Sequence, residues 1–364
     1  MAGPLSGLRV VEMAGIGPGP FTGMLLADMG ADVVRVARPG EAATTAGGSD
    51  PTLRGRSHVE TDLKSDSGRE LVLSLADAAE VLIEGFRPAV MERLGLGPDV
   101  LLARNPRLVY GRMTGWGQEG PLASTAGHDI NYIAIGGVLG AIRRRGERPL
   151  FPLNLVGDYG GGGMLLALGV VSAVVHARAT GQGQVVDAAM VEGASQLSTL
   201  IHGLHHRGMW SDEPGTNLLD SGAHFYEVYE TADGGHMSVG AIEPQFYAEL
   251  LACLDIPAED MPQWDTARWP EFKQLLDELF RSRTRQEWTT VFDGSDACVA
   301  PVLGLFEAFQ HPHNQARGSF IDVGGATVPA PAPRFSATPS HATEPATVAA
   351  EDVLARWGTA AGAA

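Results

Sequence analysis

The chain has 364 residues, of which 44% are hydrophobic and 19% are charged, so it is long enough for two domains. Its formal net charge of −17 excludes nucleic acid binding as the main activity, because neutralising phosphates requires a basic surface. The only cysteines, Cys253 and Cys298, are too few for a disulfide framework or a cysteine metal cluster.

Short runs rich in valine and isoleucine alternate with helical stretches through the first half of the chain. Strands are expected at residues 8–14, 31–37, 58–63, 81–86 and 106–117, and one more strand and helix at 184–203. Continuous apolar strands separated by helices predict βαβ units and a parallel sheet. The first domain is therefore expected to be α/β and Rossmann-like.

A different pattern begins after a loop-like stretch at 205–222. Two segments flanking an ADGG turn predict a β-hairpin, and further helices and a strand make a small α+β domain. The expected segments are the hairpin strands 225–231 and 236–242, the helices 244–254, 268–282 and 284–293, and the strand 297–303. A last short helix at 351–358 is expected to dock back on the first domain.

The predicted boundaries place the small domain inside the large one. The large domain comprises 1–204 and 325–364, the small domain comprises 223–310, and the linkers are 205–222 and 311–324. Linkers that reach out and back suit a chain that embraces a second subunit.

No segment of the chain predicts a membrane anchor or a targeting signal. The N-terminus lacks a basic start followed by a long apolar stretch, and the longest apolar run, 164–175, is about half of a membrane span. The chain ends GTAAGAA, without a peroxisomal SKL signal. We expect a cytoplasmic protein with no membrane partner.

The segment GIGPGP, residues 15–20, follows the first expected strand, where a phosphate-binding glycine loop would stand. Proline replaces the third glycine of the dinucleotide fingerprint, and proline lacks the backbone N–H that would hold a pyrophosphate. The segment is interpreted as a tight structural turn, with a nicotinamide-dependent oxidoreductase as the minor alternative.

Two segments each place an acid–base-capable side chain after a glycine at the expected start of an apolar helix. His128 and Asp129 follow Gly127, and Asp158 follows Gly157 before four consecutive glycines. Singly, such a histidine is usually structural and such an aspartate usually caps its helix. Their repetition favours proton abstraction beside a carbonyl, with an enolate oxygen held by helix N–H groups. The glycine run would leave the helix end open to a ligand.

Six segments, two of which contain His128 and Asp158, match the motifs of a known family in the same order: LADMGADVVRVARPG (26–40), TDLK (61–64), GHDINY (127–132), PLNLVGDYGGGGM (152–164), GQGQVVDAAMVEG (181–193) and PAPRFS (331–336). With these motifs the chain resembles the α-methylacyl-CoA racemases, which belong to the larger family III of CoA transferases. The resemblance implies interconversion of (2R)- and (2S)-2-methylacyl-CoA through an enolate, no metal and no separate cofactor, and an interlocked homodimer.

The same resemblance assigns the acid/base pair to His128 and Asp158, on opposite sides of the substrate's α-carbon. Reversible proton transfer needs two groups of comparable basicity, so partial burial of Asp158 is expected. Glu243 is the candidate that orients His128, and Tyr132 is a weaker one. The structural alternative is that Glu243 only begins the helix that follows it.

For CoA binding, the resemblance points to Arg38, to the residues of the TDLK segment and to those of the GHDINY segment. These are Thr61, Asp62, Leu63, Lys64, Gly127, Asp129, Ile130, Asn131 and Tyr132. Arg87 and Arg93 are further candidates, which composition alone would assign to a solvated helix surface. Methionines such as Met190 would suit a loosely shaped acyl site, although a core role is the simpler expectation.

The main rival within the family is CoA transfer between carboxylic acids, with Asp158 attacking as a nucleophile to form a mixed anhydride. Transferases of this family lack the histidine of GHDINY, and a nucleophilic mechanism does not need it. His128 therefore favours the racemase. A non-catalytic CoA-thioester binder is disfavoured because both acid–base residues are present.

Overall fold

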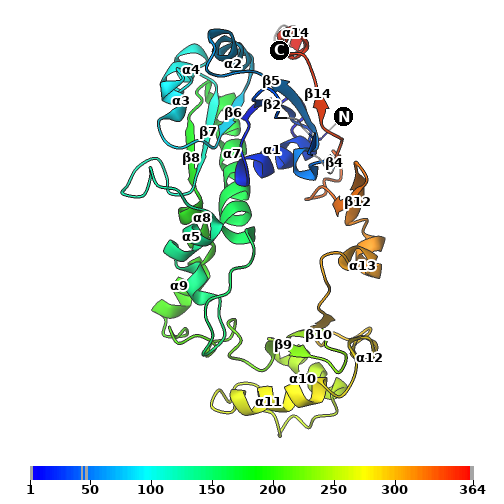
Figure 1. Cartoon of the computed structure of the whole chain (residues 1–364). Coiled ribbons are helices and arrows are strands. Elements are labelled where there is room, and N and C mark those ends of the chain that lie inside the picture. Colours follow the sequence, from blue (N-terminus) through cyan, green and yellow to red (C-terminus); the bar gives the residue numbers. More distant parts are fainter. Residues whose placement is uncertain (1–2, 42–43, 46–47, 361–364) are drawn as a thin grey trace. The chain divides into compact units, whose positions relative to one another are not determined.

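The computed structural model describes residues 3–41, 44–45 and 48–360 (Figure 1). The chain divides into two units. Unit 1 comprises Met1–Val138, Phe151–Thr199 and His313–Ala364, and unit 2 comprises Leu139–Leu150 and Leu200–Pro312.

Unit 1 is built on a seven-stranded sheet with the strand order β14-β5-β2-β1-β6-β7-β8, in which every neighbouring pair is parallel. The strands are β1 (Arg9–Met13), β2 (Asp32–Ala37), β5 (Arg56–Glu60), β6 (Val81–Glu84), β7 (Val109–Thr114), β8 (Val185–Ala189) and β14 (Ala346–Thr347). Six of them fall within the segments expected from the sequence or overlap them. The seventh, β14, was not expected, because a two-residue strand in a proline-rich segment has no alternating pattern.

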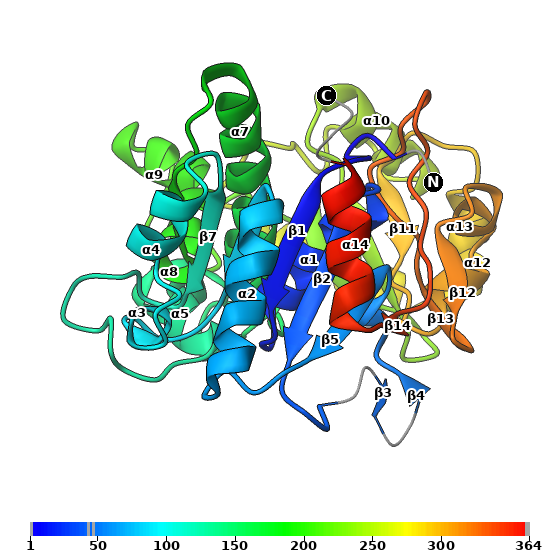
Figure 2. The same cartoon turned by 90° about the horizontal axis from the view of Figure 1, so that it is seen from above.

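Helices cover both faces of this sheet. They are α1 (Pro18–Asp28), α2 (Asp66–Ala78), α4 (Pro98–Arg104), α7 (Leu165–Thr180) and α14 (Ala350–Ala360). On one face α1 and α7 pack against Val10, Val33 and Ile83. On the other face α2 and α14 pack around Val11 and Val34, and Figure 2 shows them on the viewer's side of the sheet with α1 behind it.

Shorter elements complete unit 1 at the ends of the sheet. They are the helices η1 (Pro51–Leu53), α3 (Val90–Arg93), α5 (Asp129–Ile135), α6 (Val138–Ala141), η2 (Leu155–Met164), α8 (Met190–Leu197) and α13 (Pro312–Ala316), and the strands β3 (Thr44–Thr45), β4 (Gly48–Ser49), β12 (Phe320–Val323) and β13 (Ala326–Pro329). Of these, α6 and α13 cross the boundary between the units.

Unit 2 is the expected small α+β domain. Its antiparallel sheet has the order β11-β10-β9, and the predicted hairpin is formed by β9 and β10. Its elements are α9 (Thr199–His206), β9 (Tyr226–Glu230), β10 (His236–Gly240), α10 (Pro244–Cys253), α11 (Trp269–Phe280), α12 (Arg285–Val291), β11 (Val299–Pro301) and η3 (Ala308–Gln310). The first residue of α9, Thr199, belongs to unit 1. Aromatic side chains such as Phe225, Phe272 and Trp288 fill its core.

The unit boundaries differ from the predicted domain boundaries at both linkers. Residues 139–150 belong to unit 2, where Arg144 pairs with the buried Glu227 at 2.6 Å. The stretch expected as the linker 205–222 is also folded into unit 2, where Asn217 donates to Asp220 Oδ2 at 2.6 Å. Residues 313–324, expected as a linker, belong to unit 1. A local hydrophobic pattern does not reveal these polar attachments.

The helices η2 and α7 form one continuous apolar segment, Leu155–Thr180, of 26 residues. By length and composition it could cross a membrane, so the sequence estimate from 164–175 was too short. Half of its most apolar stretch is buried in the protein, and Leu166 and Val170 of α7 pack in the core of unit 1. This arrangement is typical of a core helix.

Candidate active site

A pocket of about 660 Å³ opens at the carboxyl ends of β1 and β6 in unit 1. The sheet continues from β1 to β2 on one side and from β6 to β7 on the other, so this is a topological switch point. Ligands of open α/β sheets bind at such points. The volume of the pocket suits a small molecule. Its walls are the loops after β1, β6 and β7, with residues from α5 and η2.

The GIGPGP segment forms the loop after β1 and the first residues of α1, and it lines the pocket rather than being only a structural turn. Gly17 has a positive φ of 70° and is the N-cap of α1, which begins at Pro18. A Cβ atom at Gly17 would lie 3.3 Å from Asp158 Oδ2, so the loop passes directly beside that carboxyl. Ile16, whose side chain is 84% exposed, projects from the same loop.

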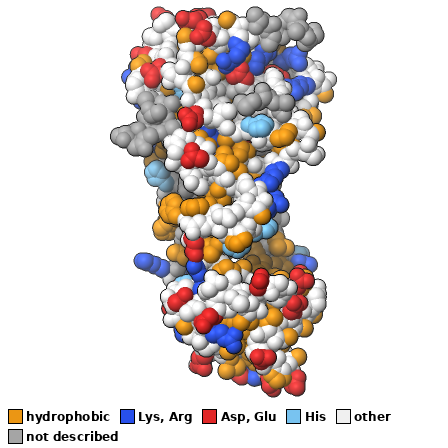
Figure 3. Space-filling model, turned by 90° about the vertical axis from the view of Figure 1, so that its right-hand side faces the viewer, with side chains coloured by type: hydrophobic (Ala, Val, Ile, Leu, Met, Phe, Trp, Pro, Cys, Tyr) orange, Lys and Arg blue, Asp and Glu red, His pale blue; other side chains and the backbone are white. Residues whose placement is uncertain are grey.

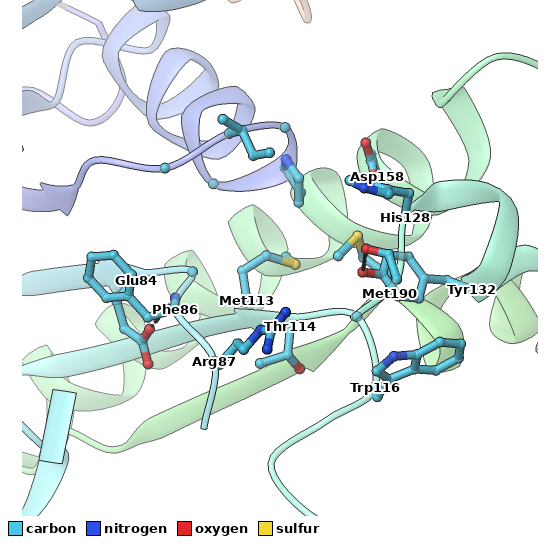
Figure 4. A pocket seen from close by; sticks show the side chains of 18 of the residues that line it. Glu84, Phe86, Arg87, Met113, Thr114, Trp116, His128, Tyr132, Asp158 and Met190 are labelled. Carbon is cyan, nitrogen blue, oxygen red and sulfur yellow. Dashed lines mark hydrogen bonds between the residues drawn. The ribbon is translucent and has the colours of Figure 1, made fainter. Parts of the chain in front are cut away.

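His128 and Asp158, the predicted acid/base pair, line this same pocket. Figure 4 shows the two side chains next to each other on one side of it. His128 is the N-cap of α5, and its backbone N–H donates to Asn131 Oδ1 at 3.1 Å. Its ring is exposed, so the imidazole is accessible to a ligand in the pocket.

Asp158 stands at the start of a helix, as expected, but it is not the cap that the structural alternative would have made it. It lies inside a π-helix, η2, which begins three residues earlier at Leu155. Asn154, the N-cap of η2, donates through Nδ2 to Asp158 Oδ2 at 3.1 Å. π-Helical segments are rare and are frequently found at functional sites.

The surroundings of Asp158 raise the pKa of its carboxyl. Burial raises the pKa of the Asp158 carboxyl, and the negative charge of Asp129 raises it further, whereas the Asn154 hydrogen bond and the charge of His128 lower it. The net direction is upward from the usual aspartate pKa, toward that of an imidazole. This is the direction that a matched acid/base pair requires.

Asp129 does not cap its own helix either. Its carboxylate accepts the backbone N–H of Asp158 at 2.7 Å, which ties α5 to η2. Tyr132, proposed as a weaker partner of His128, instead donates its hydroxyl to the Gly127 carbonyl and stacks edge-on against Trp116.

The four glycines after Asp158 pack against protein rather than leaving backbone open to a ligand. A Cβ atom at Gly161 would lie 2.5 Å from the Ala194 nitrogen of α8, and one at Gly163 would lie 2.7 Å from Phe21 of α1. The expectation of an open helix end is therefore wrong. The absence of side chains lets η2 approach its neighbouring helices closely.

The loop after β6 is held by a buried carboxylate. Glu84 accepts the backbone N–H of Phe86 at 2.7 Å and Arg112 Nε at 2.9 Å. Burial raises the pKa of Glu84 to about 7, although these two donors oppose the shift. The bond to Phe86 fixes the loop that presents Arg87, an exposed cation, in the pocket wall.

Most of the predicted CoA-binding residues fall into two groups. Arg87, Gly127 and Tyr132 line the pocket. The exposed Arg38 and the TDLK segment follow the carboxyl ends of β2 and β5, two strands that pair directly, and Thr61 N–H donates to the Ala37 carbonyl at 2.8 Å. Thus Thr61, Asp62, Leu63 and Lys64 lie along the same edge of the sheet as the pocket.

Other predicted residues lie outside the pocket wall in the described part of the chain. Arg93 is exposed at the end of α3, and Ile130 and Asn131 are exposed on α5. Asp62 Oδ1 accepts the Lys64 N–H at 2.9 Å, so its carboxylate shapes the turn that presents Lys64.

Glu243 is the N-cap of α10 in unit 2, with no hydrogen bond from its side chain to that helix. Glu243 therefore does stand at the start of the helix that follows it, as the structural alternative expects. Its action on His128, which belongs to unit 1, stays a prediction.

Three features of the pocket were not predicted from the sequence: Asn154, Glu84 and the part of GIGPGP that lines it. Asn154 stands four residues before Asp158, where one helical turn brings the two side chains together. Glu84 interrupts an otherwise apolar strand, and a charge in that context is a signal of a buried partner.

Comparisons with known proteins agree on one family. A family model described as CoA-transferase family III matches residues 5–351. A mouse protein named α-methylacyl-CoA racemase is 48% identical over 338 residues, which cover 92% of this chain and 87% of the mouse protein. A human protein of the same name is 46% identical with the same coverage. The crystal structure of a CAIB/BAIF family protein from Brucella suis has a TM-score of 0.82 and 25% identity, covering 99% of this chain and 100% of that one.

Proposed function

This chain belongs to CoA-transferase family III, and we propose that it is an α-methylacyl-CoA racemase. It interconverts (2R)- and (2S)-2-methylacyl-CoA thioesters by 1,1-proton transfer. The observation that carries the proposal is that His128 and Asp158 line one pocket and lie near enough for the charge of His128 to act on Asp158.

In the proposed reaction, one member of the pair removes the α-proton and the other returns a proton to the opposite face of the carbon. The roles of His128 and Asp158 exchange with the handedness of the substrate, which is why the two must have similar basicity. The enolate oxygen is assigned to the backbone N–H groups where α5 begins, at Asp129, and the helix dipole adds a modest stabilisation.

The CoA moiety is proposed to follow the carboxyl edge of the sheet. Arg38 and Lys64 stand beyond β2 and β5, and Arg87 stands beyond β6, so local cations are available to phosphates despite the net charge of −17. Met190 and Ile16 offer apolar surface to the acyl group beside the reacting pair.

The first test is hydrogen exchange in D2O. Incubated with one enantiomer of a 2-methylacyl-CoA and no acceptor acid, the enzyme should introduce deuterium at the α-carbon while racemising it. His128→Ala and Asp158→Asn should each lower the rate by roughly 100-fold or more, because each removes a proton-transfer group. CoA affinity should survive His128→Ala.

The same experiment discriminates the rival CoA transferase, which uses Asp158 as a nucleophile. A transferase does nothing to the thioester until a carboxylic acid is added and leaves the α-hydrogen in place. Absence of exchange, followed by thioester transfer to added acid, would establish that activity instead.

We further propose a homodimer, as the family resemblance implies. Helix α7 continues η2, and the two leave large apolar side chains exposed: Met164 of η2 at 58%, and Leu168 and Val175 of α7 at 64% and 66%. Figure 3 shows that hydrophobic side chains also reach the surface among the charged ones on the face that it draws. A second copy of the chain would remove this apolar surface from water.

The proposed enzyme is cytoplasmic, acts without a membrane partner and needs no metal or cofactor besides the CoA of its substrate. Prolonged dialysis against EDTA should leave the exchange rate unchanged. A loss that is restored by adding a divalent metal would contradict this part of the proposal.

A further inference from the structure

The Asp129 side chain lies outside the pocket wall and contacts η2, the helix that carries Asp158. The residue is 5% exposed, and its Oδ2 accepts the backbone N–H of Asp158 at 2.7 Å. Within the described residues, its Oδ1 is buried without a hydrogen-bond partner. A buried carboxylate is costly to desolvate, so its retention beside Asp158 calls for a function.

The backbone of η2 is shaped to admit this carboxylate. A Cβ atom at Gly157 would lie 2.5 Å from Asp129 Oδ2 and 3.1 Å from Ile133 Cγ2. Any side chain at position 157 would therefore displace the carboxylate. The close approach of Asp129 to the Asp158 backbone is a built feature of the site.

Asp129 is also the carboxylate that acts on Asp158 in the described part of the chain. The η2 helix packs against α1, α5, α7, α8, β7 and β8. From α5 and its cap, the ionisable groups that interact with Asp158 are His128, Asp129 and Tyr132.

Other ionisable groups on the elements around η2 are paired elsewhere or exposed. On α1 and β7, Asp28 binds Arg54 and Arg112 binds Glu84 and Glu92. The exposed groups on α7, α8 and β8 are His176, Arg178, Glu192 and Asp187.

We propose that Asp129 is a positioning residue for proton transfer, whose carboxylate fixes the Asp158 backbone and places a negative charge beside the Asp158 carboxyl. The inference rests on the proposed role of Asp158. The charge makes Asp158 a stronger base, so that the carboxyl and the imidazole of His128 can exchange one proton with little change in free energy.

The test is Asp129→Asn, which keeps an oxygen acceptor for the Asp158 N–H and removes the charge. In the pH profile of kcat/KM for racemisation, the acid limb, where activity rises with pH, should move to lower pH. At neutral pH, kcat/KM should fall roughly three- to tenfold. Both directions must change by the same factor, because the equilibrium between the enantiomeric thioesters is fixed. The apparent pKa of this acid limb describes the coupled pair of His128 and Asp158 rather than either residue alone.

The matched control is Asp187→Asn, which removes the same charge from an exposed position on β8 and should leave the profile in place. Gly157→Ala is the second variant, because its methyl group displaces the Asp129 carboxylate without changing the composition of charges. It should move the acid limb in the same direction. An unmoved limb in folded Asp129→Asn, or in folded Gly157→Ala, overturns the inference.

The two variants distinguish the role proposed for Asp158 from the role proposed for Asp129. If Asp158→Asn retains α-hydrogen exchange, the proposed acid/base pair is wrong, and the role of Asp129 falls with it. If Asp158→Asn is inactive but Asp129→Asn keeps the wild-type limb, only the inference about Asp129 is wrong.

Discussion

Asn154 and Asp129 act on the Asp158 carboxyl in opposite directions. The hydrogen bond from Asn154 lowers the pKa of Asp158, whereas the charge of Asp129 raises it. Asn154→Ala should therefore move the acid limb of the racemisation profile to higher pH, opposite to Asp129→Asn, and lower kcat/KM roughly tenfold. Gln182→Ala, at an exposed position, is the control. Movement of the limb to lower pH in Asn154→Ala would contradict the assignment.

His58 is buried on β5, where the charges of Arg35 and Arg56 act on it. Burial, followed by the charges of the two arginines, lowers the pKa of His58 from 6.5 to about 4. The unfolded chain binds a proton at this position between these pH values and the folded chain does not, so His58 costs stability as the pH falls from 6.5 toward 4. Above pH 6.5 this contribution is constant.

Replacing His58 by valine, which suits a buried strand, should remove this part of the acid sensitivity. The difference in unfolding free energy between pH 7 and pH 4.5 should shrink by about 1–3 kcal/mol, measured by urea denaturation. Burial also lowers the pKa of His224 to about 4. His224 is present in both proteins, so part of the pH dependence of the unfolding free energy should remain. Identical pH dependence in the two proteins would show that His58 is not the sensor.

At this scale, the sequence predicted two residues that line the pocket, His128 and Asp158, but not the residues that bind around them. His128 and Asp158 were singled out because acid–base side chains stood after glycines in apolar surroundings, and the family resemblance assigned the proton-transfer roles to them. The Asp129–Asp158 bond could not be predicted, because an aspartate at a helix start is ordinarily its cap. The buried pair of Glu12 with Arg56, 2.7 Å apart, joins strands far apart in sequence and has no local pattern either.

At the scale of elements, the contact between η2 and α8 depends on glycines from both helices. A Cβ atom at Gly193 of α8 would lie 1.8 Å from the Gly161 carbonyl oxygen, which is backbone and cannot move aside. Gly193→Ala should destabilise the protein by about 1–3 kcal/mol or more, as overpacking does. Gly203→Ala on α9, where a Cβ atom meets nothing within 4 Å, should be neutral or stabilising. Equal melting temperatures for the two variants would contradict this account.

The order and type of the long elements followed from hydrophobic periodicity, because each of them has one strongly apolar face or is buried entirely. The π-helix could not be predicted from periodicity, because four glycines carry no periodic signal. Their close packing depends on contacts with α1 and α8, which are distant in sequence or lie outside the local pattern. For the same reason, the glycine run was misread as an opening for a ligand.

At the scale of the whole molecule, the exposed apolar side chains of α7 lead to a prediction about assembly. Leu168→Glu combined with Val175→Glu should convert the proposed dimer to a monomer, because a dimer interface would have to bury both charges. Val100→Glu on α4, which covers the other face of the sheet, is the control for an added surface charge. Light scattering coupled to size exclusion measures the mass, and an unchanged dimer in the double variant would place the interface elsewhere.

The two-part organisation was visible in the sequence, because the α/β alternation stops where the hairpin pattern begins. The assignment of residues 139–150 to unit 2 was not, since it depends on Arg144 reaching a glutamate 83 positions away.

The C-terminal strand and helix of unit 1 have a consequence for biosynthesis. Strand β14 pairs with β5, and Trp357 of α14 is buried while it donates to Asp32 and accepts from Arg9. The ribosome makes these residues after the other elements of unit 1, so the half of the sheet made first waits with an unpaired edge and an unfilled core until β14 and α14 have emerged. Unit 2, most of which is one uninterrupted stretch, can mature in the meantime, and the nascent N-terminal half is the part most in need of chaperone protection.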